Sequence, residues 1–162
     1  MTDIETTVRE TLANSGFAHE LIPCDPDLAD TAQFCEAYGY GLDESANTIV
    51  VASRKPEGLV AVCVVLADSR LDVNGVVRRK LGARKVSFAP AELTTELTGM
   101  MIGGVTPFGL PDELPLWIDK RVAVRDLVIL GGGSRSLKVQ VDPAVLVAMG
   151  GEVVEELANP FS

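Results

Sequence analysis

A loop rich in glycine and proline at residues 97–111 constrains the fold more than any other segment. It reads Leu-Thr-Gly-Met-Met-Ile-Gly-Gly-Val-Thr-Pro-Phe-Gly-Leu-Pro. Glycine lets backbone N–H groups approach a ligand closely, and proline stiffens the loop by fixing φ. Such a loop binds through main-chain donors, which suit a carboxylate, a phosphate, a carbonyl or a developing oxyanion. A purely structural surface turn is the alternative, and the residues leave both open.

Short helices and short strands are predicted on both sides of this loop. Apolar residues at helical spacing, with glycine, proline or aspartate at the ends, predict helices at 4–15, 30–38, 72–81, 90–98 and 142–149. Runs of Val, Ile and Leu predict strands at 18–23, 47–53, 59–67, 85–89, 114–118, 127–130 and 137–141, with a hairpin turn at 54–58. The pattern predicts an α+β fold with a mixed, curved sheet and surrounding helices. Residues 158–162 are expected to fray.

Length and composition favour a single globular domain spanning residues 1–162. Of its residues, 47% are hydrophobic and 23% charged, which suffices for a real core. No apolar run approaches the roughly 20 residues of a membrane span, and the N-terminus lacks the features of a signal peptide. Three cysteines without a CxxC spacing favour a reduced, cytoplasmic protein. With one histidine and no Cys/His cluster, no metal site and no cofactor are expected.

The charge is distributed unevenly along the chain. The formal net charge of −9 argues against simple nucleic-acid binding. Residues 70–85, however, hold six basic side chains against Asp72, so this segment carries +5 and the remainder −14. A basic segment on an acidic body could contact a phosphate backbone, and a solvated helix face is the alternative.

The cysteines favour packing over catalysis. A cysteine nucleophile needs a base beside it, and His19 is the single histidine available to Cys24. Cys63, within Val-Cys-Val-Val, is predicted to lie in the core, and Cys35 on a helix is expected to be buried as well.

Two other features have an ordinary structural interpretation beside a functional one. Asp25, Asp27 and Asp30 could hold a cation, but they lack the glycine and closing glutamate of an EF-hand loop, so a solvated loop with a helix cap is favoured. Trp117 is predicted to be an interior strand residue, with base stacking as the alternative.

Several motifs occur together in a consistent order. They are Thr31-Ala32, Arg70-Leu71-Asp72, Leu81-Gly82-Ala83-Arg84-Lys85-Val86, Glu96-Leu97-Thr98-Gly99, Gly103-Gly104-Val105-Thr106-Pro107-Phe108-Gly109 and Gly132-Gly133-Ser134-Arg135-Ser136-Leu137. In this order the chain closely resembles the YbaK/prolyl-tRNA-editing domain family. The resemblance implies a partly barrel-like β-sheet flanked by helices. It also implies a trans-acting hydrolase that deacylates tRNA mischarged with a small amino acid such as Ala, Ser, Pro or Cys.

The resemblance implies a site as well. Backbone N–H groups of two glycine loops would hold the ester carbonyl while water, helped by a hydroxyl of the terminal ribose, attacks it. Gly103 and Gly104 would be the donors, and Arg135 would brace the second loop or meet a phosphate. The expected substrate-binding residues are Thr31, Thr106, Pro107, Gly109, Gly131, Gly132, Gly133 and Arg135. The expected partner is the acceptor end of aminoacyl-tRNA, a tRNA synthetase is a further candidate, and neither a membrane nor DNA is implied.

One departure from the family pattern lies at Asn47. Family members commonly carry a lysine there, and an asparagine has donors and an acceptor but no charge. Loss of a charge-assisted contact costs about 1.5–3 kcal/mol if nothing replaces it. Lys55 and Arg54 lie too far along the same predicted strand to substitute. Two alternatives therefore stay open: a weak or inactive binding module for tRNA acceptor ends, and a relative acting on another small acylated ligand. With an intact pocket, Asn47→Lys should increase deacylation and Gly104→Ala should abolish it.

Overall fold

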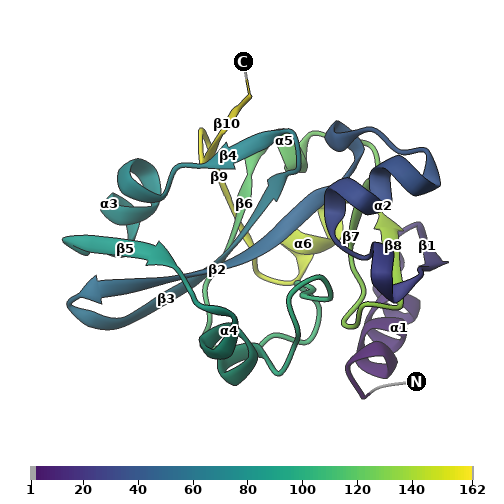
Figure 1. Ribbon diagram of the computed structural model, residues 1–162, viewed down its shortest axis with the longest axis horizontal. Helices are drawn as coiled ribbons and strands as arrows, with labels where there is room; N and C mark the ends of the chain where they lie inside the picture. The colour runs from purple at the N-terminus through teal and green to yellow at the C-terminus, as the bar shows by residue number, and fades with distance from the viewer. Residues whose placement is uncertain (1–2, 162) are drawn as a thin grey trace.

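A five-stranded mixed sheet forms the centre of the computed structural model, which describes residues 3–161 (Figure 1). Its strand order is β5-β2-β3-β6-β9. The strands are β2 (Ala46–Lys55), β3 (Glu57–Leu66), β5 (Lys85–Phe88), β6 (Leu116–Asp119) and β9 (Glu152–Val154). The first three pair antiparallel, whereas β3–β6 and β6–β9 are parallel. The predicted mixed sheet is confirmed.

Two smaller sheets complete the β-structure of the described residues. An antiparallel sheet joins β1 (His19–Pro23), β8 (Leu137–Val141) and β7 (Val128–Gly131), and a bridge from Ser45 to Ile129 connects it to the start of β2. A two-stranded sheet pairs β4 (Ser69–Leu71) with β10 (Ala158–Pro160). The sheets stay separate and do not close into a barrel, in contrast to the partly barrel-like arrangement expected.

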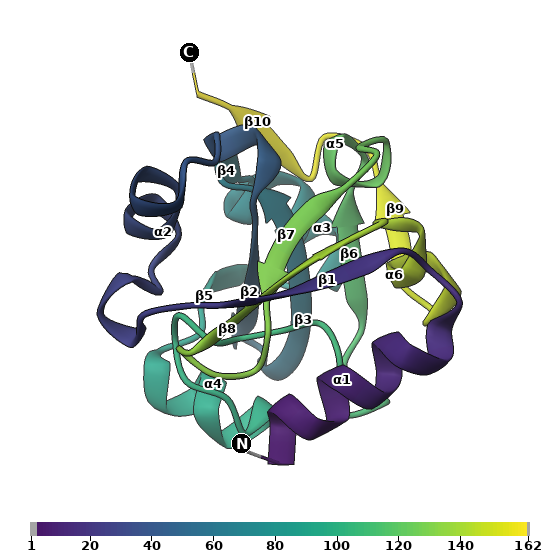
Figure 2. The same cartoon turned by 90° about the vertical axis from the view of Figure 1, so that its right-hand side faces the viewer.

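Helices cover these sheets on several sides (Figures 1 and 2). They are α1 (Asp3–Ser15), α2 (Thr31–Tyr38), α3 (Arg78–Leu81), α4 (Ala91–Thr98), α5 (Lys120–Ala123) and α6 (Ala144–Ala148), with 3-10 turns at Pro26–Leu28 and Leu42–Glu44. Left-handed glycines end three of the predicted helices, at Gly39, Gly82 and Gly99.

Two local predictions are confirmed with different details, and a third is wrong. The predicted helix at 72–81 is present, but it begins as a π-helical turn, Val73–Val77, which Asp72 caps by accepting hydrogen bonds from the N–H groups of Gly75 and Val76. The predicted hairpin is also present, but its turn is tighter than 54–58, with β2 reaching Lys55 and β3 starting at Glu57. Residues 158–160 do not fray, because they pair with β4.

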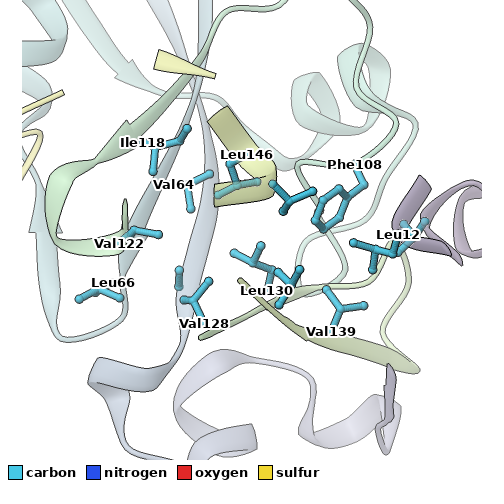
Figure 3. Close-up of a cluster of buried hydrophobic side chains, with 14 residues drawn as sticks. Leu12, Val64, Leu66, Phe108, Ile118, Val122, Val128, Leu130, Val139 and Leu146 are labelled. Carbon is cyan, nitrogen blue, oxygen red and sulfur yellow. The ribbon is translucent and has the colours of Figure 1, made fainter. Parts of the chain in front are cut away.

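The main core lies between the five-stranded and three-stranded sheets (Figure 3). Val8 and Leu12 of α1 belong to this core together with residues of β3, β7 and β8, as the helical spacing predicted. A second cluster on the other face of the large sheet includes Cys63 and Trp117, which are 0% and 6% exposed. Strand β3 is therefore buried on both faces, which explains its continuous apolar run.

Helix α2 covers the outer face of the three-stranded sheet. Phe34 and Cys35 of α2 pack with Ile129 of β7, and Ile22 of β1 lies against them. Strand β7 is consequently enclosed on both faces, by the main core on one and by α2 on the other. This arrangement determines the surroundings of the candidate site.

Candidate functional site

Two glycine loops, 99–109 and 131–136, meet backbone to backbone. The N–H of Gly133 donates to the carbonyl of Gly104 over 2.9 Å. A Cβ on Gly104 would lie 2.6 Å from the carbonyl carbon of Ser134, and one on Gly131 would lie 2.1 Å from the carbonyl oxygen of Val105. Real Cβ atoms do not approach so closely, so glycine at these positions is what permits the contact.

Arg135 braces this junction. Its Nη1 donates to Ile102 O (3.0 Å) and to the Asp30 carboxylate (3.1 Å), and its Nε donates to Pro26 O (3.0 Å). The guanidinium thus ties the first glycine loop to the segment that leads into α2. Of the two roles expected for Arg135, this conformation shows the brace.

A cavity of about 410 Å³ opens beside the two loops; we call it the central cavity. The start of α2, the first half of β2, the end of β5, α4, both glycine loops and β8 contribute to its wall. The lining residues are Asp30, Thr31, Ala46, Asn47, Thr48, Ile49, Val50, Phe88, Ala89, Thr94, Ile102, Gly103, Val105, Gly131 and Lys138. The wall combines apolar side chains with several polar or charged ones, as small-ligand sites do.

Strand β2 presents the polar part of one wall. Asn47 Oδ1 accepts a hydrogen bond from Thr31 Oγ1, the first residue of α2, at 2.5 Å. Thr48 Oγ1 is buried and has no hydrogen-bond partner among the described residues. A buried hydroxyl without a partner is rare in folded proteins and is available to a ligand.

Lys138 provides a cation that sequence reasoning missed. It lies on β8, is 6% exposed, and its Nζ donates to the carbonyl oxygen of Gly103 over 3.2 Å. The alternation of Leu137, Val139 and Val141 is typical of a strand with one buried face, and it places residue 138 on the opposite face. The structure covers that face with α2, and Nζ lies 5.6 Å from the ring centroid of Phe34.

Burial lowers the pKa of Lys138 from its ordinary value of 10.5. Arg135 acts in the same direction, whereas Cys24, Asp30 and Cys35 oppose it. Burial in turn raises the pKa of the Cys24 and Cys35 thiols, which keeps them neutral. Lys138 therefore has no fully committed negative charge beside it, because Asp30 is paired with Arg135.

Several residues expected to bind substrate do not line the central cavity. Thr106 is fully buried inside the first loop, where its Oγ1 accepts from the N–H of Phe108. Gly109 faces Thr7 of α1. Pro107, Gly132 and Gly133 are buried and also lie outside the cavity wall. These residues hold the loops in place.

The N–H groups of the first loop are placed differently from expectation as well. The N–H of Gly104 donates to Met101 O over 2.9 Å and is occupied within the loop. In this conformation Gly104 is therefore not a free carbonyl donor. Gly103 does reach the cavity, but it presents its carbonyl oxygen to Lys138.

The basic segment 70–85 does not surround the central cavity. None of its six basic residues lines the cavity, and Figure 1 shows α3 and β5 beside the far end of the β2–β3 hairpin. Lys80 pairs with Glu152 of β9, the edge strand of the large sheet opposite to β5. Lys85 instead lines a neighbouring groove together with Arg54 and Lys55.

The geometry does not support a Cys24–His19 catalytic pair or a cation site at Asp25, Asp27 and Asp30. Cys24 Sγ donates to Asp25 O, whereas His19 Nδ1 contacts Phe17 O at the opposite end of β1. Asp25 caps the turn Pro26–Leu28 through the N–H of Asp27. Among residues 3–161 no group of three His, Cys, Asp or Glu side chains is placed to hold a metal ion, and none of the helices there is long and apolar enough to cross a membrane.

Comparisons of the fold identify a class of proteins. A structure described as a "putative trans-editing enzyme for prolyl tRNA synthetase" superposes with a TM-score of 0.78 at 22% identity, covering 96% of this chain and 97% of that one. The structure of hypothetical protein APE2540 gives a TM-score of 0.83 at 27% identity, with 94% and 99% coverage. The α+β fold is thus that of editing proteins of the YbaK type.

The family follows from the sequence match. The chain belongs to the aminoacyl-tRNA editing domain family, whose model matches residues 25–149. YwhH of Bacillus subtilis is 30% identical over 119 residues, covering 73% of this chain and 73% of that protein. EbsC of Enterococcus faecalis, named "Putative Cys-tRNA(Pro)/Cys-tRNA(Cys) deacylase", is 20% identical over 123 residues, covering 76% and 73%.

Proposed function

We propose that this chain is a trans-acting hydrolase that removes a small amino acid from mischarged tRNA. The observation that carries the proposal is the central cavity itself, which places a glycine loop, three threonine side chains and a buried ammonium around one small space. Family membership supports aminoacyl-tRNA deacylation in general, and EbsC is a relative whose name states that activity. A cavity of about 410 Å³ with alanine and valine in its wall suits a small acyl group such as Ala, Ser, Pro or Cys.

The rim of the cavity suits the nucleoside to which the acyl group is attached. Phe88 and Ile102 line the cavity yet remain 54% and 51% exposed. Exposed aromatic side chains stack on unpaired bases, and a tRNA acceptor end is single-stranded. We infer that the acyl group enters the cavity while the terminal adenosine rests on this rim.

In the proposed reaction water is the second substrate. Its oxygen adds to the ester carbonyl carbon, and the carbonyl electron pair moves onto the carbonyl oxygen. When the carbon–oxygen bond to the ribose breaks, the ribose oxygen takes up the proton that water has lost. The products are a free amino acid and a tRNA with an intact terminal ribose, so no cofactor is needed.

Deacylation of a panel of mischarged tRNAs tests the proposal directly. We expect wild type to release Ala, Ser, Pro or Cys from at least one tRNA faster than the spontaneous rate, measured as loss of radiolabelled aminoacyl-tRNA. Failure on every member of the panel would contradict the proposed function and favour a small acylated ligand without RNA. The position of the basic segment away from the cavity is the observation that favours this second candidate.

The same panel tests Asn47→Lys. The sequence predicts an increase, because the variant restores the charge of the lysine that family members commonly carry at this position. Since Lys138 already lines the same cavity, we expect wild type to be active and Asn47→Lys to change turnover by less than about tenfold, equivalent to ~1.4 kcal/mol. Turnover by the Asn47→Lys variant alone would contradict this expectation and would mean that Lys138 does not supply the charge.

A thiol mechanism is tested by Cys24→Ser. Burial raises the pKa of Cys24, and its Sγ donates to Asp25 O, so we expect the serine variant to keep turnover within about threefold, below ~1 kcal/mol. The matched control is Cys63→Ser, at a core thiol whose pKa burial raises to about 12 and which does not line the cavity. Loss of turnover in Cys24→Ser, with turnover kept in Cys63→Ser, would contradict direct attack by water and would indicate a cysteine nucleophile.

A further inference from the structure

The buried ammonium of Lys138 lacks the partners that such a group requires. Its Nζ makes one hydrogen bond, to the carbonyl oxygen of Gly103, although an ammonium has three donors. None of the ion pairs among the described residues includes Lys138. Buried charges in proteins are normally paired, because desolvation of a lone charge is expensive. A cation that a fold keeps buried, unpaired and facing a cavity is suited to an anion that arrives with the ligand.

The position of Lys138 limits what that anion can be. The side chain is 6% exposed, so it meets only the part of a ligand that enters the cavity. A phosphate diester of an RNA backbone stays hydrated and is better served by the exposed basic residues Arg54, Lys55 and Lys85 of the neighbouring groove. The group that enters is the acyl ester, whose carbonyl oxygen becomes negative as water adds.

Resting on the proposed function, we propose that Lys138 is a catalytic residue whose ammonium binds the carbonyl oxygen of the acyl ester as it becomes an oxyanion. The carbonyl of Gly103 orients Nζ toward the cavity by accepting one of its N–H groups. The two remaining N–H groups donate to the oxygen that receives the electron pair. When the bond to the ribose breaks, the carbonyl forms again and this oxygen loses its negative charge. Stabilisation of developing charge by a preorganised donor is the largest single contribution in many hydrolases. This role replaces the expected donation by the N–H of Gly104, which is occupied by Met101.

Two adenosine derivatives test this assignment without requiring turnover. One is an alanyl amide of 3′-amino-3′-deoxyadenosine, which has a neutral carbonyl, and the other is the corresponding phosphonate monoester, which carries a permanent tetrahedral anion. We expect Lys138→Met to weaken phosphonate binding by roughly 10- to 150-fold in calorimetry, while amide binding changes little. The control is Lys120→Met, which removes the same charge from an exposed ion pair with Glu155 and should leave both affinities unchanged.

Thermal unfolding gives a second readout that a structural lysine would not produce. Removal of an unpaired buried charge should leave the Tm of Lys138→Met equal to or above that of wild type. The difference should be greatest while Lys138 is protonated in both folded and unfolded states. It should narrow as pH rises from the lowered pKa of the folded state toward 10.5, because the folded protein then loses its proton first. The charged and titratable groups that act electrostatically on Lys138 are Cys24, Cys35, Asp30 and Arg135.

The outcomes separate this inference from the proposed function. Equal phosphonate binding by wild type and Lys138→Met, or a lower Tm of the variant, overturns the role of Lys138 even if wild type deacylates tRNA. A fall in kcat with KM retained supports the oxyanion assignment, whereas a rise in KM alone overturns it in favour of ground-state binding. Wild type that deacylates nothing and binds neither probe overturns both proposals.

Discussion

Gly131→Ala is expected to reduce deacylation by a hundredfold or more while the protein remains folded. The new Cβ would lie 2.1 Å from the carbonyl oxygen of Val105, and both residues line the central cavity. Ordinary contact requires at least 3.4 Å, so the two loops must separate by more than an ångström. A displacement of about 1 Å in a catalytic arrangement costs on the order of 100-fold in rate. The measurement is single-turnover deacylation at a temperature where circular dichroism shows the variant folded.

Two further glycine variants make this experiment specific. Gly104→Ala should behave like Gly131→Ala, because its Cβ would lie 2.6 Å from the backbone of Ser134. Gly150→Ala is the control: its φ of +98° imposes backbone strain, but nothing lies within 4 Å of the added carbon and the residue does not line the cavity. Normal turnover in a folded Gly131→Ala protein would show that contact between the loops does not shape the site.

Phe108→Ala is expected to be the most destabilising single substitution in the first glycine loop. Phe108 is fully buried in the main core beside Leu12, Leu130 and Val139 (Figure 3). Truncation of a buried phenylalanine to alanine costs about 3–5 kcal/mol, through lost burial and the cavity left behind. For a domain of this size the corresponding fall in Tm is roughly 6–20 °C. Differential scanning calorimetry measures it.

The matched control for Phe108 is a phenylalanine on the surface. Phe161 is 56% exposed and contacts Arg70, so Phe161→Ala should change the free energy of unfolding by about 0.5 kcal/mol or less. A change below about 1 kcal/mol for Phe108→Ala would mean that the loop is not anchored in the core. Because the loop supplies Gly103 and Val105 to the cavity, we also expect turnover of Phe108→Ala to fall before global unfolding begins.

Local chemistry made much of the fold predictable. The spacing of Val8 and Leu12 predicted helix α1, and left-handed glycines ended the helices where expected. The alternation in Leu137–Val141 predicted which residues of β8 face the main core. Short-range patterns determine such features, because helix ends and strand faces depend mainly on neighbouring residues. The same patterns failed at 158–160, where pairing with a distant strand decided the outcome.

The sequence by itself determined the family, and it singled out two glycine loops and Asn47 as candidate site residues. Only the tertiary structure decided which of these residues reach one cavity: Thr31, Asn47, Gly103 and Gly131 line it, whereas Thr106, Pro107 and Gly109 support the loop from outside. The tertiary structure also decided which cation lies in the site. Strand alternation assigns Lys138 to the face of β8 that points away from the main core. It contains no information that α2, about a hundred residues earlier in the chain, covers that face. This cover is the reason that the ammonium is buried.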